Sequence, residues 1–405
     1  MRVVHFNEHL NWTGGVETYL LHLLPRLESQ GVENHYVFAM GNAELVPRAY
    51  HLPEIAKIGR YHEAVGWTRT VRLLKDLQPD VVHIHRVYNL GIVRACLEYC
   101  PTVVTCHDYL YLCPAGSFFH RRTASICKRR AGPGCFLTTL LKHCMTPRPG
   151  YAFAYYRRVR RFIDWKDRYS TILCPSDFVR ERLLTTGFSP GRCLTLPYFC
   201  PLEPLPEPRQ LPHAATILFL GRIRPIKGYD VFIRSLGMLR DVKGIMVGDI
   251  NDQTRRRISA LVQDCGCKDR LDLRPWARRE EIEGLFAETT VFVFPSICPE
   301  TLGIVGLEAM ACGVPVVASD VGGVRQWLQQ GVNGLLVPPK DASALARAVE
   351  HLLTVPERLL SMGQAGIETV RRDFSPEKHV RRLLEIYQQV AKTGSIVTAT
   401  RSNCG

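Results

Sequence analysis

The segment from residue 290 to residue 318 constrains the fold of this chain most strongly. The run TVFVF (290–294) has the composition of a buried strand, and a second such run, VPVVA (314–318), follows it. Between them lie a polar loop and a stretch with the composition of a short helix. Strand, loop, helix and strand in this order form a parallel crossover. The sequence therefore predicts an α/β fold built on parallel sheet.

Two carboxylates, Glu300 and Glu308, bracket the loop and helix of this crossover. If residues 301–308 are mostly helical, the two acids lie roughly 12 Å apart along the helix axis, at about 1.5 Å per residue. Backbone amides at the positive end of the helix dipole would face an anion between the acids, and those amides belong to Gly303, Ile304 and Val305. A phosphate flanked by hydroxyl-bearing groups describes a sugar nucleotide. The alternative is a pair of solvated surface acids.

The segment PETLGIVGLEAMACGVPVVASDVGG (299–323) resembles the Glu-x7-Glu signature of glycosyltransferase family 4, the retaining glycosyltransferases with the GT-B fold. This resemblance implies that Glu300 approaches the donor sugar and that Glu308 hydrogen-bonds the ribose hydroxyls. It also implies two Rossmann-like domains with parallel sheets that face each other across a cleft, with the donor bound mainly by the C-terminal domain.

A second motif supports the same family. The strand TILFL (216–220) is followed directly by GRIRPIKG, which resembles the family pattern G-R-x(4)-K-G and contains Arg222 and Lys227. A guanidinium and an ammonium at the end of a strand can bind phosphate oxygens and stabilise a leaving nucleoside diphosphate. No Asp-x-Asp metal motif occurs, so we expect no metal cofactor, and the donor nucleotide is expected to be UDP- or GDP-linked. The alternative is that both cations are solvated.

The N-terminal half repeats the alternation of strands and helices. Residues 2–6 predict a strand, and two glycines then open a helix without the dinucleotide pattern G-x-G-x-x-G, which disfavours a Rossmann dehydrogenase. The resemblance implies that Gly15, in this turn, contacts the diphosphate and the acceptor. His83 and His85 alternate on the strand 81–85, where histidines are more often structural than catalytic.

The strand 102–106 ends at His107 and Asp108, and ligands of open α/β sheets bind at the carboxyl ends of strands. A neutral histidine can donate to a sugar hydroxyl or a phosphate, and the neighbouring aspartate can orient it or bind the acceptor. The family resemblance places a similar histidine near the transferred sugar. We therefore predict a catalytic role for His107 and acceptor binding for Asp108, with a core histidine as the alternative.

Length and proline content predict the domain organisation. The 405 residues exceed one ordinary core, and six prolines crowd residues 197–212, where neither helix nor sheet can persist. We predict an N-terminal acceptor-binding domain (1–200), a linker (201–213), a C-terminal nucleotide-sugar-binding domain (214–375), a crossover helix that returns to the first domain (376–392) and a disordered tail (393–405).

Positive charge is concentrated in one segment. The chain carries a net charge of +14, and residues 109–168 hold 13 basic against 2 acidic side chains. No nucleic-acid-binding module is recognisable, so we favour anionic lipid or a phosphorylated acceptor over nucleic acid. Residues 151–168 predict an amphipathic helix whose basic face could lie on an anionic leaflet, or whose other face packs on the interior. Without a signal peptide or an apolar run of about 20 residues, we expect a cytoplasmic protein, peripheral on the inner face of the plasma membrane.

The fifteen cysteines of the chain are expected to be buried thiols rather than disulfides. The loop-rich insert 109–150 contains four of them, Cys113, Cys127, Cys135 and Cys144, separated by 14, 8 and 9 residues. A zinc or iron–sulfur site at these thiols is an alternative, but no C-x-x-C occurs, so we expect no metal there.

Together with these observations, the family resemblance implies a retaining, metal-independent glycosyltransferase. It would move a sugar from a nucleotide-diphosphate sugar to a glycan or lipid-linked acceptor, in the assembly of cell-surface polysaccharide or lipopolysaccharide. One alternative is a sugar-nucleotide epimerase of the same fold, which needs no acceptor. Another, from a different class, is a non-catalytic sugar-nucleotide-binding protein or assembly partner.

Overall fold

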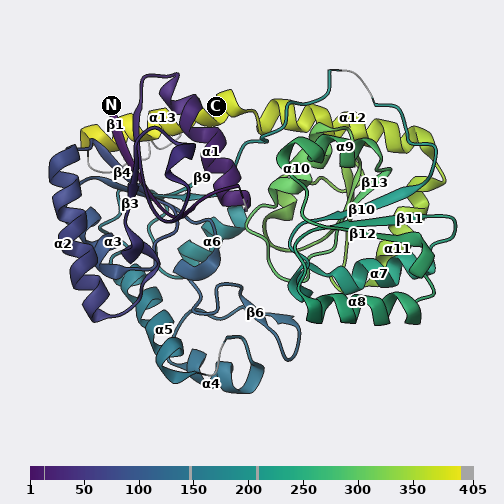
Figure 1. Cartoon of the computed structure of the whole chain (residues 1–405), viewed down its shortest axis with the longest axis horizontal. Coiled ribbons are helices and arrows are strands. Elements are labelled where there is room, and N and C mark those ends of the chain that lie inside the picture. The colour runs from purple at the N-terminus through teal and green to yellow at the C-terminus, as the bar shows by residue number, and fades with distance from the viewer. Residues whose placement is uncertain (13, 146–147, 207–208, 394–405) are drawn as a thin grey trace, which may run out of the picture. The chain divides into compact units, whose positions relative to one another are not determined.

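The computed structural model describes residues 1–12, 14–145, 148–206 and 209–393. It divides into two units: an N-terminal unit, formed by Met1–Tyr198 and the helix α13 (Pro376–Thr393), and a C-terminal unit, Phe199–Ser375 (Figure 1). The segment predicted as linker lies at the start of the C-terminal unit. The segment predicted as a disordered tail lies, beyond Thr393, outside the described residues. Each unit contains a parallel sheet, which confirms the predicted α/β class with two Rossmann-like sheets.

The sheet of the N-terminal unit has seven strands in the order β3-β2-β1-β4-β5-β8-β9, and every neighbouring pair is parallel. Its strands are β1 (Arg2–Leu10), β2 (Glu33–Gly41), β3 (Ala49–His51), β4 (Val81–Ile84), β5 (Thr102–Thr105), β8 (Thr171–Cys174) and β9 (Cys193–Thr195). The central strands are buried along their whole length because helices cover both faces of the sheet, as parallel sheets require.

Several helices of the N-terminal unit begin at a capping side chain, a glycine or a proline. Asn89 caps α3 (Leu90–Tyr99) and Ser176 caps α6 (Asp177–Thr185), whereas Pro149 is the first residue of α5 (Pro149–Asp164). Further helices are α1 (Gly15–Glu28), α2 (Arg60–Leu77) and α4 (Gly134–Lys142). The insert 109–150 adds a small antiparallel hairpin, β6 (Phe119–His120) and β7 (Ser125–Ile126), near α4 (Figure 1).

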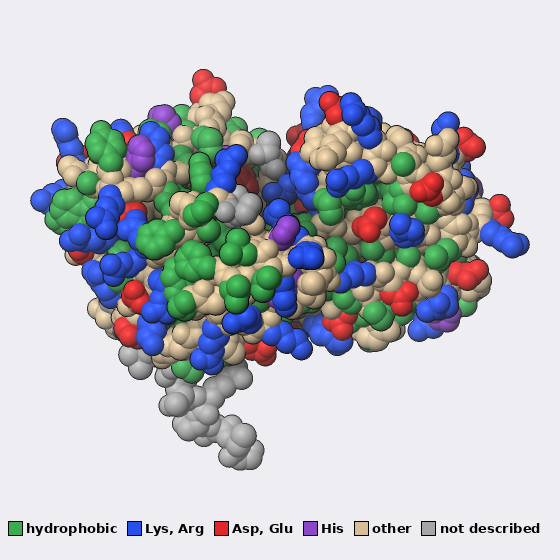
Figure 2. All heavy atoms as spheres, turned by 90° about the horizontal axis from the view of Figure 1, so that it is seen from below, with side chains coloured by type: hydrophobic (Ala, Val, Ile, Leu, Met, Phe, Trp, Pro, Cys, Tyr) green, Lys and Arg blue, Asp and Glu red, His purple; other side chains and the backbone are tan. Residues whose placement is uncertain are grey.

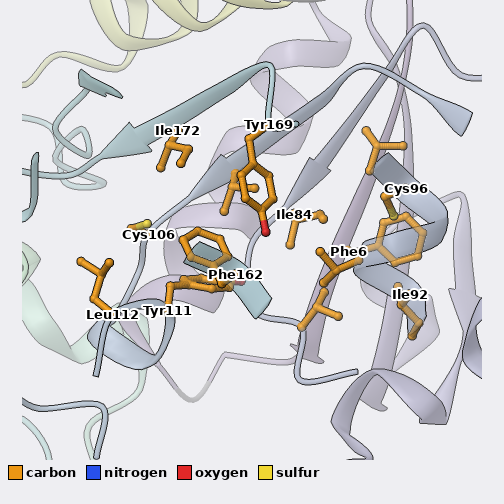
Figure 3. Packing of buried hydrophobic residues seen from close by; sticks show 14 of the residues in the cluster. Phe6, Ile84, Ile92, Cys96, Cys106, Tyr111, Leu112, Phe162, Tyr169 and Ile172 are labelled. Carbon is orange, nitrogen blue, oxygen red and sulfur yellow. The ribbon is translucent and has the colours of Figure 1, made fainter. Parts of the chain in front are cut away.

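Aromatic side chains join α5 to the core of the N-terminal unit. The ring of Phe162 lies between those of Tyr111 and Tyr169, with centroid distances of 4.5 and 4.8 Å (Figure 3). Arg158 is also buried, and its guanidinium stacks on Tyr88 at 4.7 Å and on Tyr111 at 5.3 Å. Arg158 is therefore not part of the basic face predicted for residues 151–168, because an arginine can bury its planar head against aromatic rings.

The sheet of the C-terminal unit has six parallel strands in the order β12-β11-β10-β13-β14-β15. They are β10 (Thr216–Leu220), β11 (Lys243–Val247), β12 (Leu271–Arg274), β13 (Val291–Phe294), β14 (Val316–Ser319) and β15 (Gly334–Val337). The helices are α7 (Tyr229–Met238), α8 (Asp252–Asp264), α9 (Ile282–Ala287), α10 (Ile304–Ala311), α11 (Ala342–Leu353) and α12 (Pro356–Asp373). Figure 1 shows α7 and α8 on one side of this sheet and α10 on the other.

One detail of the central crossover differs from expectation. Helix α10 begins at Ile304 rather than at residue 301, because Gly303 has a φ of 98° and cannot continue a right-handed helix. The glycine pair at 322–323 opens a short 3-10 helix, Gly322–Gln326. None of the helices in the described part of the chain is long and apolar enough to cross a bilayer.

Candidate functional site

Glu300 is held in an ion pair at the carboxyl end of β13. Its side chain is 11% exposed, and the Lys227 ammonium lies 2.7 and 2.9 Å from its two oxygens. The hydroxyl of Ser296 donates a further hydrogen bond to the same carboxylate. The structure thus brings together Glu300 and Lys227, two residues that lie in separate sequence motifs.

A close backbone approach places Lys227 beside Glu300. Gly228 follows the lysine in a left-handed conformation with a φ of 73°, and a Cβ at this position would lie 1.9 Å from the carbonyl oxygen of Pro295. The amide of Ile297 also donates to the carbonyl of Ile226 at 3.0 Å. Only glycine permits the turn after β10 to pack this tightly against the loop after β13.

The N-terminus of α10 faces the same loop. Amides in the first turn of a helix have no intrahelical acceptor and carry the positive end of its dipole, and here they include those of Ile304 and Val305, next to Gly303. The indole of Trp327 donates to the carbonyl of Leu302 at 2.7 Å and fixes the chain just before the helix. Helix N-termini of this kind can bind anions, and that an anion binds here stays a prediction from the sequence.

Glu308 lies on α10 and is 7% exposed. Its carboxylate pairs with the guanidinium of Arg279, in the 3-10 helix Arg279–Glu281. A second nitrogen of this guanidinium, Nη2, is buried and has no hydrogen-bond partner within the described residues. Sequence reasoning missed Arg279, because it lies in a charged run, RREEIE, without a recognisable motif.

Arg222 follows β10 and is exposed, and no ion pair of its side chain occurs in the described ranges. The neighbouring Arg224 pairs with Asp249 at 3.0 Å. Trp276, two residues after β12, is 42% exposed and so is not packed in the core. Arg222 thus remains accessible to a ligand.

In the N-terminal unit, Gly15 is the first residue of α1 and is exposed. Asp108 caps the 3-10 helix Tyr109–Tyr111, and its Oδ1 accepts from the amide of Leu110 at 2.8 Å. Its Oδ2 lies 3.4 Å from Nε of Arg86. Both predicted residues therefore lie at the carboxyl edge of the N-terminal sheet, where ligands of α/β folds bind.

His107 is the end of a chain of buried histidines. Its Nε2 lies 2.8 Å from Nδ1 of His85, and Nε2 of His85 lies 3.1 Å from Nδ1 of His5. Nε2 of His5 lies 3.1 Å from Oδ1 of Asn34, and at the other end Nδ1 of His107 lies 2.7 Å from the hydroxyl of Tyr198. Parallel pairing of β1, β4 and β5 aligns these side chains.

The two ends of this chain fix its direction. The amide nitrogen of Asn34 donates to the carbonyl of Leu24 at 3.0 Å, so its oxygen accepts from His5. Each neutral imidazole then carries its proton on Nε2 and accepts on Nδ1, and the Tyr198 hydroxyl donates to His107. Both ring nitrogens of His107 are therefore engaged inside the unit, which leaves neither available for direct donation to a ligand in this state.

Burial keeps these histidines neutral. Loss of solvation lowers the pKa of His5 to about 4 and the pKa of His107 to about 3, with Arg86 lowering the latter further. The pKa of His85 is also lowered, first by burial and then by the neighbouring histidines. His83 and His85 are fully buried and so serve as core residues rather than substrate contacts.

The donor set of this cluster could also suit a metal. Ring nitrogens of His5, His83 and His85 lie within 4.8 Å of one another. However, both nitrogens of His83 are already bonded, to Tyr387 at 2.5 Å and to Thr105 at 2.7 Å. Among the described residues, the four insert cysteines form no such group of three donors, and the cysteines there are free thiols.

Two Rossmann-like units, with acids, cations and a helix N-terminus at the carboxyl edge of the second sheet, define a protein of the GT-B class. The chain belongs to glycosyltransferase family 4. The family model described as Glycosyltransferase Family 4 matches residues 13–203, and the model described as Glycosyl transferases group 1 matches residues 207–369.

Similar proteins agree with this assignment. The chain is 34% identical over 179 residues to a D-inositol 3-phosphate glycosyltransferase of Xylanimonas cellulosilytica, a match that covers 44% of this chain and 42% of that protein. The chain thus spans less than half of the length of that relative. A Rickettsia africae glycosyltransferase has a similar structure, with a TM-score of 0.74 at 18% identity, over 97% of this chain and 99% of the other.

Anabaena HepE, solved with UDP and glucose, also has a TM-score of 0.74, at 16% identity over 96% of this chain and all of the other. At this identity the likeness concerns the fold alone.

Proposed function

We propose that this chain is a retaining glycosyltransferase that takes a sugar from a UDP- or GDP-linked donor without a metal ion. The observation that carries the proposal is the meeting of two acid–cation pairs, Glu300 with Lys227 and Glu308 with Arg279, on either side of one helix N-terminus. This set offers cations and amides to a diphosphate and carboxylates to hydroxyl groups. Family membership supports the same reading.

The cations act on the leaving group. Departure of a nucleoside diphosphate builds negative charge on its β-phosphate, and groups that bind this charge more strongly in the transition state accelerate transfer. The Lys227 ammonium has a third proton beyond its contacts to Glu300 and can share it with the phosphate. Arg222 and the first amides of α10 add further donors. Attack on the face that the phosphate leaves retains the anomeric configuration, so an inverted product would reject this mechanism.

Glu308 is proposed to accept hydrogen bonds from the ribose hydroxyls. The contact with Arg279 orients this carboxylate. The unpartnered Nη2 of Arg279 gives the same site one more donor, which suits a phosphate or ribose oxygen. His107, whose ring is engaged inside the N-terminal unit, is proposed to act only after Tyr198 or His85 releases one of its nitrogens.

The donor proposal is tested by thermal stabilisation. Wild type, Glu308→Ala and the exposed control Glu350→Ala are heated with UDP, GDP or ADP, each with and without EDTA. A nucleotide at 100 times its dissociation constant adds about 2.7 kcal/mol. We expect one nucleotide to stabilise wild type and control regardless of EDTA, and Glu308→Ala to lose the shift. If no nucleotide stabilises wild type, a non-catalytic assembly role becomes the better reading.

The acceptor is proposed to be a glycan or a lipid-linked glycan of the cell surface, as in polysaccharide or lipopolysaccharide assembly, reached at an anionic membrane face. The support is an exposed apolar surface on α4 and the first turn of α5, formed by Leu137, Leu140, Leu141, Tyr151 and Phe153. Lys and Arg side chains surround hydrophobic ones on this face of the N-terminal unit (Figure 2). Apolar side chains rimmed by positive charge fit the surface of an anionic bilayer.

A further inference from the structure

Three carboxylates surround a single arginine in the N-terminal unit. Oε2 of Glu8 lies 3.2 Å from Arg86, Oε1 of Glu17 lies 3.8 Å from it, and Oδ2 of Asp108 lies 3.4 Å from it. The side chain of Arg86 is 26% exposed, and its Nη2 also donates to the hydroxyl of Tyr88 at 3.0 Å. We call Glu8, Glu17, Arg86 and Asp108 the Arg86 cluster.

The topology places this cluster where a ligand of the N-terminal unit would bind. Glu8 lies near the end of β1, Arg86 follows β4 and Asp108 follows β5, and these three strands are parallel neighbours. Glu17 enters from the first turn of α1, which begins at Gly15. Carboxyl ends of adjacent parallel strands form the ligand-binding edge of open α/β sheets.

One cation cannot satisfy three anions. Burial lowers the pKa of Arg86, but Asp108, Tyr88 and Glu8 raise it more strongly, so the guanidinium stays charged. The next cation is Arg158, which stacks on the ring of Tyr88. Even with Arg158 counted, carboxylates exceed guanidiniums by one. His9, whose Nε2 lies 3.5 Å from Oε2 of Glu8, and Tyr88, whose hydroxyl accepts from Arg86, are further titratable groups in contact with the cluster, and His107 lies next to Asp108 in the chain.

One carboxylate oxygen of the cluster lacks a hydrogen-bond donor. Oε1 of Glu17 is buried without a hydrogen-bond partner in the part of the chain that the structure describes, and the side chain is only 6% exposed. A buried carboxylate oxygen without a donor costs free energy, which a donor from a ligand can remove. The other oxygen packs against Gly14, where a Cβ would lie 2.3 Å from Oε2.

We propose that the Arg86 cluster is the acceptor subsite, and that it selects a hydroxyl-rich sugar end that carries no phosphate beside the reacting hydroxyl. This inference rests on the proposed transferase function and names its acceptor. Sugar hydroxyls donate hydrogen bonds to Glu8, Glu17 and Asp108, whereas a phosphate offers no donors and meets an excess of negative charge. The charge of the Arg86 guanidinium, which could otherwise attract a phosphate, is shared among the three acids, although its buried Nε has no hydrogen-bond partner in the described part of the chain.

Under this proposal, the acceptor of this chain differs from the inositol 3-phosphate for which its relative is named. In a lipid-linked acceptor, the phosphate would then lie away from the reacting sugar. The basic residues of α5 and the insert, rather than the Arg86 cluster, are the groups that would meet it.

The experiment compares two acceptors that differ by one phosphate, myo-inositol and D-myo-inositol 3-phosphate, together with a panel of alkyl glycosides. Binding to the full chain is measured by calorimetry, and release of the nucleotide from the donor is measured with each compound. The variants are Glu8→Gln, Asp108→Asn and their combination. The control is Asp164→Asn, which removes a carboxylate from the exposed side of α5.

We expect wild type and control to bind the phosphate-free compounds at least tenfold more tightly than inositol 3-phosphate. In the double variant, this ratio of affinities should be about tenfold smaller. Preference of wild type for inositol 3-phosphate, or an unchanged ratio in the double variant, would overturn the proposal. If the double variant does not fold, the two single variants are expected to narrow the ratio about threefold each.

Failure of the donor proposal is recognised separately. If the donor proposal fails, wild type shows neither nucleotide binding nor slow hydrolysis of the donor by water. The calorimetric comparison of myo-inositol with its 3-phosphate would still show whether the Arg86 cluster prefers the phosphate-free compound. A second measurement is the stabilisation of the protein by inorganic phosphate at constant ionic strength. Phosphate should stabilise the double variant more than wild type, and equal stabilisation of the two would count against the proposal.

Discussion

The ion pair between Lys227 and Glu300 should couple the stability of the C-terminal unit to its ligand site. The perturbation is Lys227→Met, which keeps most of the side-chain volume and removes the charge. The Glu300 side chain is 11% exposed. Of the side-chain donors to its carboxylate described above, only the Ser296 hydroxyl then remains. Glu300→Gln and the double variant complete a thermodynamic cycle.

The magnitude follows from distance and burial. Contacts of 2.7 and 2.9 Å correspond to a gross attraction of about 6 kcal/mol at an effective dielectric constant of about 20. Loss of solvation offsets much of this attraction, and removal of one partner of a fully buried pair costs about 3–5 kcal/mol. Because the Lys227 side chain is 25% exposed, water screens the pair. We therefore expect Lys227→Met to cost about 2 kcal/mol.

The assay is thermal and urea unfolding of the four proteins, followed by tryptophan fluorescence, to which Trp327, buried in the C-terminal unit, contributes as one of five tryptophans. A loss of about 2 kcal/mol should lower the melting temperature of a domain of this size by roughly 4–8 °C. The double variant should recover part of this loss, with a coupling energy of about 1–2 kcal/mol. The exposed pair Arg325 and Asp320 is the control, with an expected coupling below about 1 kcal/mol.

Additive effects would refute this reasoning. If the Lys227 and Glu300 substitutions add within about 0.5 kcal/mol, the two side chains do not interact in solution, and the proposed sharing of the ammonium with a phosphate loses its basis. The same variants serve a second measurement. Lys227→Met should also lose the stabilisation by the donor nucleotide, because a methionine offers no donor to a phosphate.

Other features lead to further expectations. Tyr198→Phe removes the donor to Nδ1 of His107 and should lower the stability of the N-terminal unit by about 1–3 kcal/mol; an unchanged urea midpoint would contradict the assigned tautomers. Burial lowers the pKa of His5 to about 4, so below pH 6.5 the unfolded chain binds a proton that the folded chain does not. Stability should therefore fall as the pH decreases from 6.5 towards 4, by about 2 kcal/mol at pH 5. The His5→Gln variant should show a shallower dependence, and equal slopes would argue against a buried neutral histidine. Leu137→Asp with Leu140→Asp should weaken binding to vesicles of anionic lipid, measured by co-sedimentation, about tenfold or more; binding that is insensitive to both salt and these substitutions would count against the membrane face.

Sequence patterns could predict those parts of the fold and the site that depend on neighbouring residues. The alternation of apolar runs and glycine turns predicts both parallel sheets, since each run is long enough to cross a sheet and too short for a helix. The two motifs likewise predict Glu300 and Lys227 at strand ends. The start of α10 was missed because it depends on the backbone conformation of a single residue, Gly303. The pattern of apolar residues carries no information about that conformation.

Contacts between distant segments could not be predicted in this way. The histidine chain exists because the register of β1 on β4 pairs His5 with His83, and that of β4 on β5 pairs His83 with Val103. A shift of one residue would turn these side chains to the opposite face. Arg279 and Arg86 were missed for a related reason, because each is one arginine among many until the fold brings a carboxylate to it.

The balance of charge differs between the two candidate sites, and this difference assigns them different ligands. In the C-terminal unit, each acid has its own cation, and the Nη2 of Arg279 and the exposed Arg222 add donors beyond that pairing. In the N-terminal unit, three acids share the charge of Arg86, so negative charge is in excess, and among the described residues neither Oε1 of Glu17 nor Nε of Arg86 has a hydrogen-bond partner. Spare donors bind phosphate oxygens and spare acceptors bind hydroxyl groups. A chain that joins a diphosphate donor to a hydroxyl acceptor needs one site of each kind.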